Sequence, residues 1–192
     1  MDIVKLFVDY STNFISTGGI LYGFLIVFIE CLIPMLPLGV FVALNVNAFG
    51  PIIGVGISWI ATTLGSFLVY MLFTFLERKF VNKFVNRKTI NRIMKAIKKF
   101  KKITFPELVL LITLPFTPSC FINIISGLAR VPKKKFLLSI FIGKIFTVIF
   151  WGYIGKSFIE SMHDIKSIIF IVIALLIAYI ISKIVSKKMN IE

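Results

Sequence analysis

Few side chains in this 192-residue chain could do chemistry, and Glu30 is the most informative of them. It stands immediately before residues 31–76, which contain no Asp, Glu, Lys or Arg. Counted from residue 20 at the rise of a helix, Glu30 lies about 15 Å into an apolar segment. An ionised carboxylate is costly there, which favours a role in binding or proton exchange. The alternative is a structural lock, in which backbone amides hold the carboxylate.

Lys144 is the second charged residue inside an apolar segment. It lies roughly 12 Å from the start of residues 136–158, counted at the helical rise. Its side chain either reaches back to the membrane surface or supplies a buried cation. In a hydrocarbon core of about 30 Å the depths of Glu30 and Lys144 nearly coincide. We therefore expect the two charges to face one cavity and to pair when no anion is bound.

A helix start is predicted at Thr117, Pro118 and Ser119, with the Thr117 hydroxyl as N-cap and Pro118 at the first helical position. A helix N-terminus in mid-membrane would point free amides at a phosphate. Asn123, one turn further on, could donate an amide hydrogen. For Ser119 and Asn123, two structural roles are equally consistent with the sequence: capping a kink in the helix, and forming a hydrogen bond to another helix.

Other chemistry finds no support in the sequence. There is no nucleophile–base pair, no metal-ligand cluster and no glycine loop of the kind that binds ATP phosphates. Cys31 and Cys120 lack CxxC spacing and are interpreted as small buried hydrophobes, and His163 as a solvated loop residue. We therefore expect neither an enzyme nor a cofactor or metal.

The composition is that of a membrane protein. Hydrophobic residues make up 58% of the chain, 21 residues are Phe, and the mean hydropathy is +1.00. A soluble domain of this length cannot bury so much apolar surface. The net charge is +14, but half of the 22 basic residues lie between Arg78 and Lys102, beside apolar segments. This location is typical of cytoplasmic loops next to an anionic leaflet and argues against nucleic acid as a partner.

The placement of the basic clusters also predicts a topology. All basic clusters lie on the same side of the membrane only if residues 105–130 enter the membrane and return to the side from which they came. The turn would then lie at Pro115 and Pro118. Residues 20–50 carry a similar pair, Pro34 and Pro37, and would enter from the opposite face. The predicted fold is an all-α polytopic membrane protein with two opposed re-entrant helical hairpins in an inverted repeat.

We expect a single membrane domain, 1–192, with about three full transmembrane helices and two helices at the membrane surface. In the segment 78–102, apolar residues recur at helical spacing between Lys95, Lys98 and Lys99, which favours a surface helix over a solvated loop. The predicted segments are an interfacial helix at 1–17, hairpin 1 at 20–50, a transmembrane helix at 51–76, the basic helix at 78–102, hairpin 2 at 105–130, and transmembrane helices at 136–158 and 165–183.

The order of these residues resembles the DedA superfamily, and more closely its VTT-domain branch, also called SNARE-associated Golgi proteins. The resemblance covers roughly residues 20–160. It is carried by Glu30 with its proline pair, by the second proline pair with Asn123, and by glycines along the chain. Those glycines are Gly50, Gly54, Gly65 and Gly127.

That resemblance implies two opposed re-entrant hairpins and movement of lipids across membranes. Bacterial members are implicated with undecaprenyl phosphate and phosphatidylethanolamine, and eukaryotic relatives act as phospholipid scramblases. Many relatives carry an arginine shortly before the second proline pair, where this chain has Ile112. Lys144 is our candidate for the replacing cation.

The expected function is a translocase or scramblase for an anionic phospholipid or polyprenyl phosphate, with or without proton coupling, and with lipid head groups as its partners. The expected location is the plasma membrane, with the basic loops and the C-terminus in the cytoplasm. Two alternatives remain open: a proton-coupled transporter of a small ion, and a membrane-organising protein that transports nothing.

Overall fold

A computed structural model describes residues 2–33, 38–83, 87–160 and 165–188, and every regular element in these ranges is a helix. The predicted all-α class is therefore confirmed for them. His163, Pro34 and Pro37 lie outside the described residues. The helices are α1 (Asp2–Thr17), α2 (Gly19–Leu32), α3 (Leu38–Lys83), α4 (Arg87–Lys102), α5 (Phe105–Thr113), α6 (Ser119–Leu128), α7 (Lys133–Glu160) and α8 (Ile165–Lys188).

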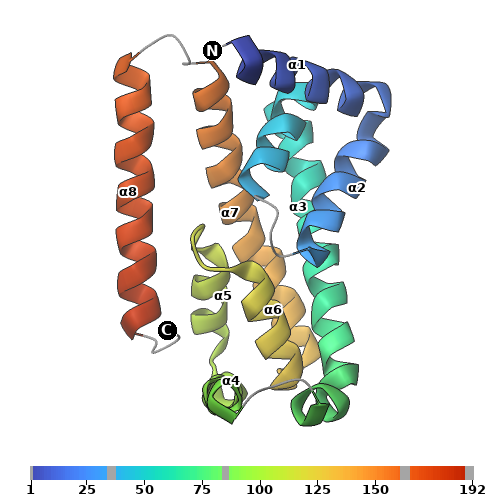
Figure 1. Cartoon of the computed structure of the whole chain (residues 1–192), viewed down its shortest axis with the longest axis vertical. Helices are drawn as coiled ribbons and strands as arrows, with labels where there is room; N and C mark the ends of the chain where they lie inside the picture. The colour runs from blue at the N-terminus through green and yellow to red at the C-terminus, as the bar shows by residue number, and fades with distance from the viewer. Residues whose placement is uncertain (1, 34–37, 84–86, 161–164, 189–192) are drawn as a thin grey trace.

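Helix α1 lies across one end of the molecule, at the top of Figure 1. It turns into α2 at Gly18 and Gly19, where the two helices are bent by 118°. Gly19 has a φ of +65°, a left-handed conformation that glycine adopts without steric cost. The glycine pair therefore separates a helix lying across the end from one running into the body.

Hairpin 1 consists of α2 and residues 38–49 of α3, and the C-terminal end of α2 lies near mid-height of the molecule (Figure 1). At Gly50 the helix breaks with φ +79°, and Pro51 begins its long second part. Gly54 then packs on the returning arm, because a Cβ there would lie 2.4 Å from the Asn45 carbonyl oxygen. Only glycine lets the two parts of α3 approach so closely.

Hairpin 2 consists of α5 and α6 and extends from the opposite end of the molecule (Figure 1). At its base, Thr104 and Glu107 form a capping box at the start of α5. At its tip, Leu114 is extended and the Thr117 amide donates to the Leu114 carbonyl over 3.3 Å. The reversal thus falls between Pro115 and Pro118.

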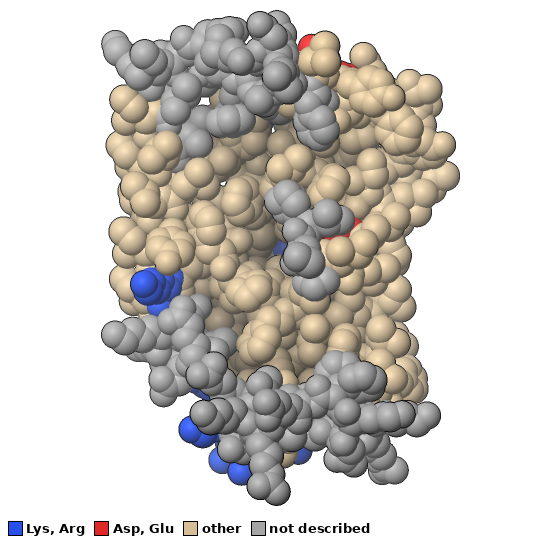
Figure 2. Space-filling view, viewed as in Figure 1, with Lys and Arg blue, Asp and Glu red and all other residues tan. Residues whose placement is uncertain are grey.

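Two of the described helices are long and apolar enough to cross a membrane, Leu38–Leu76 and Lys133–Ser157, or three if the bent pair α1–α2 counts as one. Helix α8 contributes the shorter apolar stretch Leu175–Val185. Large apolar side chains cover the outside, as at Ile52 and Phe75. On the face in Figure 2, Lys and Arg gather at the lower end. The chain is therefore a helical membrane protein, and its number of spans stays a prediction.

The main core lies toward the basic end, between α3, α6 and α7. Tyr70 of α3 stacks on Phe136 of α7 and donates its hydroxyl hydrogen to the Val131 carbonyl. Ile97 and Phe100 of α4 are buried in the same core. We predicted that the apolar side of the basic helix faces the membrane. Instead Ile97 and Phe100 face protein, because the ends of α6 and α7 leave apolar surface uncovered there.

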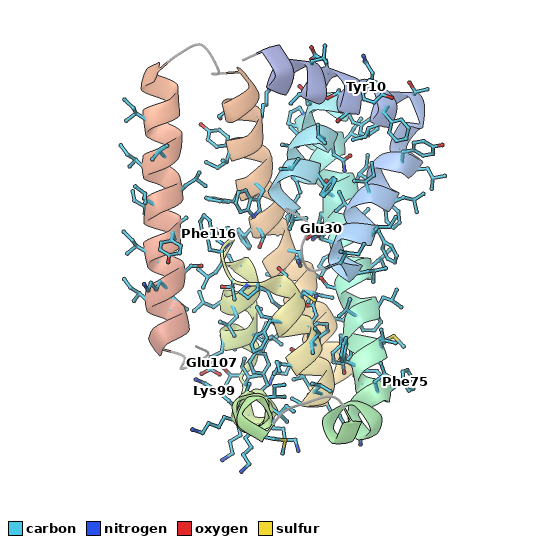
Figure 3. The ribbon with its side chains drawn as sticks, in the orientation of Figure 1. Tyr10, Glu30, Phe75, Lys99, Glu107 and Phe116 are labelled. Atoms are coloured by element: carbon cyan, nitrogen blue, oxygen red, sulfur yellow. The ribbon has the colours of Figure 1, made fainter. Side chains whose placement is uncertain are left out.

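The basic helix is also shorter than predicted. Residues 78–83 continue α3, and α4 begins at Arg87. Lys95 and Lys98 are exposed and Lys99 is partly buried. Helix α4 lies across the lower end of the molecule, where Figure 3 labels Lys99.

Candidate functional site

Glu30 lies in the last turn of α2, at the tip of hairpin 1 and at mid-height of the molecule (Figure 3). Its side chain is half-buried, and the neighbouring Cys31 thiol donates to its Oε2 atom over 3.5 Å. The carboxylate is thus held by the protein at the level where the two halves of the fold meet.

The position of Glu30 depends on close packing of α2 against α3. The Cys31 thiol also approaches the Thr62 carbonyl oxygen at 3.8 Å. Gly65 makes this approach possible, since a Cβ there would lie 2.7 Å from the Cys31 Cβ. The absence of a side chain at Gly65 therefore determines how closely Glu30 can approach α3.

Lys144 of α7 is one of the most deeply buried side chains, with 1% of its surface exposed. Its side chain is therefore enclosed by protein. Its charge and that of Glu30 interact electrostatically, although the two groups form no direct ion pair in the described part of the chain. Both charges also act on the thiols of Cys31 in α2 and Cys120 in α6. Glu30 and Lys144, far apart in sequence, therefore lie within electrostatic range of each other and of Cys120 in the first turn of α6.

Ile112, which stands where many relatives carry an arginine, lies next to Lys144. A Cβ at Gly143 would lie 2.7 Å from the Ile112 Cγ2 atom, so Ile112 packs directly on the residue before Lys144. Ile112 itself is 3% exposed. The structure therefore puts the buried lysine of α7 beside the helix that carries position 112.

The predicted start of α6 is wrong by one residue. Pro118, not Thr117, is the N-cap, because its carbonyl accepts the first helical hydrogen bond, from the Ile122 amide. No side chain caps this helix. Thr117 is held in the preceding turn, and its buried hydroxyl has no hydrogen-bond partner. Ser119 becomes the first helical residue, and the amides of this turn remain open to an anion.

Asn123 follows one turn later and is 2% exposed. Further along α6, Gly127 packs on α3, since a Cβ there would lie 2.6 Å from the Tyr70 carbonyl oxygen. Hairpin 2 is thereby pressed against the long helix that also supports Glu30. Cys31 and Cys120 are both free thiols, the first buried and the second partly so.

Sequence reasoning overlooked a polar stripe along α3. Asn45 donates to the Gly23 carbonyl and to the Ser58 hydroxyl, both over 3.0 Å. Its Oδ1 atom is buried without a hydrogen-bond partner. The four-residue spacing was the available signal, because residues four apart share one face of a helix. The stripe consists of Ser58, Thr62, Ser66, Tyr70 and Thr74.

Opposed helical hairpins, an apolar exterior and charges inside the fold together define a helical membrane protein with a polar interior site. The VTT domain matches residues 36–157, more than half of the chain. The chain therefore belongs to the VTT-domain family, and its predicted resemblance to that branch of the DedA superfamily is confirmed.

Two proteins of Bacillus subtilis (strain 168) are similar to the chain. The uncharacterized membrane protein YhjE is 33% identical over 138 residues, which cover 71% of this chain and 65% of YhjE. The uncharacterized protein YqeD is 28% identical over 150 residues, which cover 77% of this chain and 71% of YqeD. The chain thus spans slightly less than two thirds of the length of YhjE. No solved structure matches the chain.

Proposed function

We propose that the protein is a lipid translocase or scramblase that passes an anionic head group, of a phospholipid or a polyprenyl phosphate such as undecaprenyl phosphate, across the bilayer. The observation that carries the proposal is the convergence of Glu30 and Lys144 inside an apolar protein. Buried charges in membrane proteins are costly and usually mark a substrate or ion pathway. Membership of the VTT-domain family supports the same conclusion.

In this proposal the two helical hairpins are re-entrant, with tips that meet at mid-membrane. The Lys144 ammonium and the open amides at the start of α6 attract the phosphate. The lipid tail stays in the bilayer. No group arranged for covalent chemistry takes part, so the protein acts as a transporter rather than an enzyme.

Glu30 gives the proposed cycle a means of resetting. Without phosphate, its carboxylate balances the Lys144 charge across the site. When phosphate binds Lys144, the half-buried Glu30 loses that partner and takes up a proton, because an unpaired carboxylate in an apolar environment favours its neutral form. Release of the phosphate on the other side reverses both changes, so lipid movement is coupled to proton exchange.

We further propose a plasma-membrane location in which α4 and the other basic segments face the cytoplasm. Lys95 and Lys98 on α4 are exposed at the end where basic side chains gather. Such a surface is complementary to anionic head groups.

The decisive test is lipid flipping in vesicles that contain the purified protein. Labelled phosphatidylethanolamine and undecaprenyl phosphate are compared, and uptake of water-soluble ions is measured in parallel. The proposal expects flipping in the wild type and its loss in Glu30→Gln. Glu107→Gln is the matched control, because Glu107 lies at the base of hairpin 2, away from Glu30 (Figure 3).

Three outcomes contradict the proposal. Ion uptake without flipping would favour the small-ion transporter. A wild-type protein that moves neither lipids nor ions would favour a membrane-organising role. Equal activity in the wild type and Glu30→Gln would remove Glu30 from the mechanism.

A further inference from the structure

A cluster of aromatic side chains joins the tip of hairpin 2 to α7 and α8. The Phe116 ring meets Trp151 of α7 edge to face, with centroids 5.7 Å apart. It meets Tyr179 of α8 in the same way, at 5.9 Å and 85°. Figure 3 labels Phe116 close to the mid-height level of Glu30. The cluster therefore lies at the depth of the candidate site.

Trp151 fixes one side of this cluster to hairpin 1. A Cβ at Gly39 would lie 2.5 Å from the Trp151 Cε3 atom, so the indole lies flat against a position without a side chain. Trp151 also packs against a small core that includes Val42 and Val148. The indole thus contacts both hairpins, and this packing fixes its position.

The other side of the cluster is weakly held. In the described part of the chain, α8 lies at one side of the bundle and packs mainly against α7 (Figure 1). Its apolar side chains are about half exposed on several faces, for example Leu176 at 55%, Ile177 at 53% and Ile180 at 54%. In a membrane these faces contact acyl chains. Separating Phe116 from Tyr179 therefore disrupts little packing and leaves both rings in an apolar medium.

A cation lies directly beside this contact. The Lys183 ammonium is 5.9 Å from the centroid of the Tyr179 ring, one turn along α8 toward its C-terminal end. Lys183 is exposed, whereas Lys144 is buried at the inner site. The exposed Lys183 thus lies beside Tyr179, and the buried Lys144 lies on α7, the helix that carries Trp151. Their charge is complementary to a phosphate group.

We propose that phosphate-bearing lipids enter laterally between hairpin 2 and α8, where Lys183 receives the head group and Phe116 separates from Tyr179 to admit it. The acyl or polyprenyl chain then lies along Trp151. This inference rests on the proposed function, since it names the route to the same site. Lys183 sets the preference for anionic lipids on entry, before Lys144 is reached.

The test uses Trp151 as a reporter of bound lipid. The chain has two tryptophans, so Trp59→Phe leaves Trp151 alone, and Trp151→Phe gives the background from Trp59. The full-length protein is placed in vesicles with a small fraction of brominated phosphatidylglycerol or brominated phosphatidylcholine, whose bromines quench indole fluorescence on contact. We expect stronger quenching of Trp151 by the anionic lipid, and loss of that excess in Lys183→Gln.

Lys134→Gln is the matched control, because it removes the same charge from an exposed residue at the start of α7. It should retain the excess quenching. Quenching by the zwitterionic lipid reports on folding and should be equal in all variants. Equal quenching by both lipids in the parent protein, or equal loss in the two lysine variants, would overturn the entry route.

Flipping is measured on the same vesicles to separate the two proposals. Selective quenching without flipping would refute the proposed function and leave the lipid site standing. Flipping without selective quenching would refute the entry route alone.

Discussion

Thr147 of α7 donates its hydroxyl hydrogen to the Ile112 carbonyl, 2.8 Å away in the last turn of α5. The same hydroxyl lies 3.2 Å from the Thr113 carbonyl oxygen. The last carbonyls of a helix lack partners within that helix. This side chain therefore completes the end of α5 and ties hairpin 2 to the helix that carries Lys144.

Replacing Thr147 with valine should destabilise the protein by about 1–3 kcal/mol, the usual cost of leaving a buried polar group without its partner. Valine preserves the shape of threonine and removes the hydroxyl. Unfolding of the purified protein in detergent by a chemical denaturant measures the change. Thr147→Ser keeps the donor and should stay closer to the wild type, whereas equal destabilisation by both variants would mean that packing, not the hydrogen bond, matters.

Gly65 gives a second prediction, since it governs the approach of α2 to α3. In Gly65→Ala the new methyl group would lie 2.7 Å from the Cys31 Cβ and 3.2 Å from the Phe28 carbonyl oxygen. We expect the free energy of unfolding to fall by about 1–3 kcal/mol, which is typical of overpacking. Lipid flipping should also slow, because Glu30 moves with α2.

Gly56→Ala is the control in the same helix, because a Cβ there has nothing within 4 Å. Alanine favours helix over glycine, so this variant should be as stable as the wild type or more so. If the two variants behave alike in stability and flipping, close packing at Gly65 does not position Glu30.

Some features of the fold follow from patterns in the sequence. The apolar runs identified the membrane class, and the second proline pair falls where α5 and α6 separate. The N-cap of α6 was misplaced by one residue, because Thr117 as N-cap with Pro118 at the first helical position is the usual pattern, whereas Pro118 is the N-cap here. Only the turn that holds the Thr117 amide decides between them.

Other features depend on tertiary packing and escaped prediction. The apolar stripe of α4 has the same spacing whether it meets lipid or protein, so burial of Ile97 and Phe100 could not be foreseen. The polar stripe of α3 was overlooked because isolated Ser and Thr residues hardly change hydropathy. The Phe116–Tyr179 contact joins separate segments, and no local pattern signals it.

Glu107 provides a prediction about pH at the base of hairpin 2. The Thr104 amide and hydroxyl donate to its Oε2 atom over 2.7 and 2.8 Å and hold the pKa of Glu107 below its ordinary value of 4.5. A lowered pKa stabilises the folded form above the unfolded pKa, and this contribution is lost as pH falls through the folded value.

The amides at the start of α5 should therefore lose protection from hydrogen exchange as the pH falls below about 4.5, after correction for intrinsic rates. They should keep their protection at neutral pH. Glu107→Gln has no carboxylate to protonate and should lack this acid transition. A transition of the same size in Glu107→Gln would assign it to another group.

The proposed orientation can be checked with single cysteines in intact cells. Lys101→Cys and Lys134→Cys lie at the basic end and should resist an impermeant thiol reagent. Tyr10→Cys lies on α1 at the opposite end (Figure 3), where 74% of the side chain is exposed, and should react. Wild-type protein measures any reaction of Cys31 and Cys120. Labelling of Lys134→Cys but not Lys101→Cys would mean that hairpin 2 crosses the membrane.

The last prediction concerns the coupling of Glu30 and Lys144. Glu30→Gln keeps the shape of the side chain and removes its charge and exchangeable proton, so flipping should fall to a small residual rate while the protein still folds. Lys144→Ala should slow flipping of phosphate-rich lipids such as undecaprenyl phosphate more than that of phosphatidylethanolamine, because it removes the inner cation.

If both residues serve one site, their effects on the flipping rate should not add. The double variant should then be little worse than the more impaired single variant, with an interaction energy of about 0.5–3 kcal/mol. Lys133→Ala, an exposed lysine of the same helix, should combine additively with Glu30→Gln. Additive effects of Glu30→Gln and Lys144→Ala would show that the two charges act separately, and the shared site would be refuted even if each residue proved essential alone.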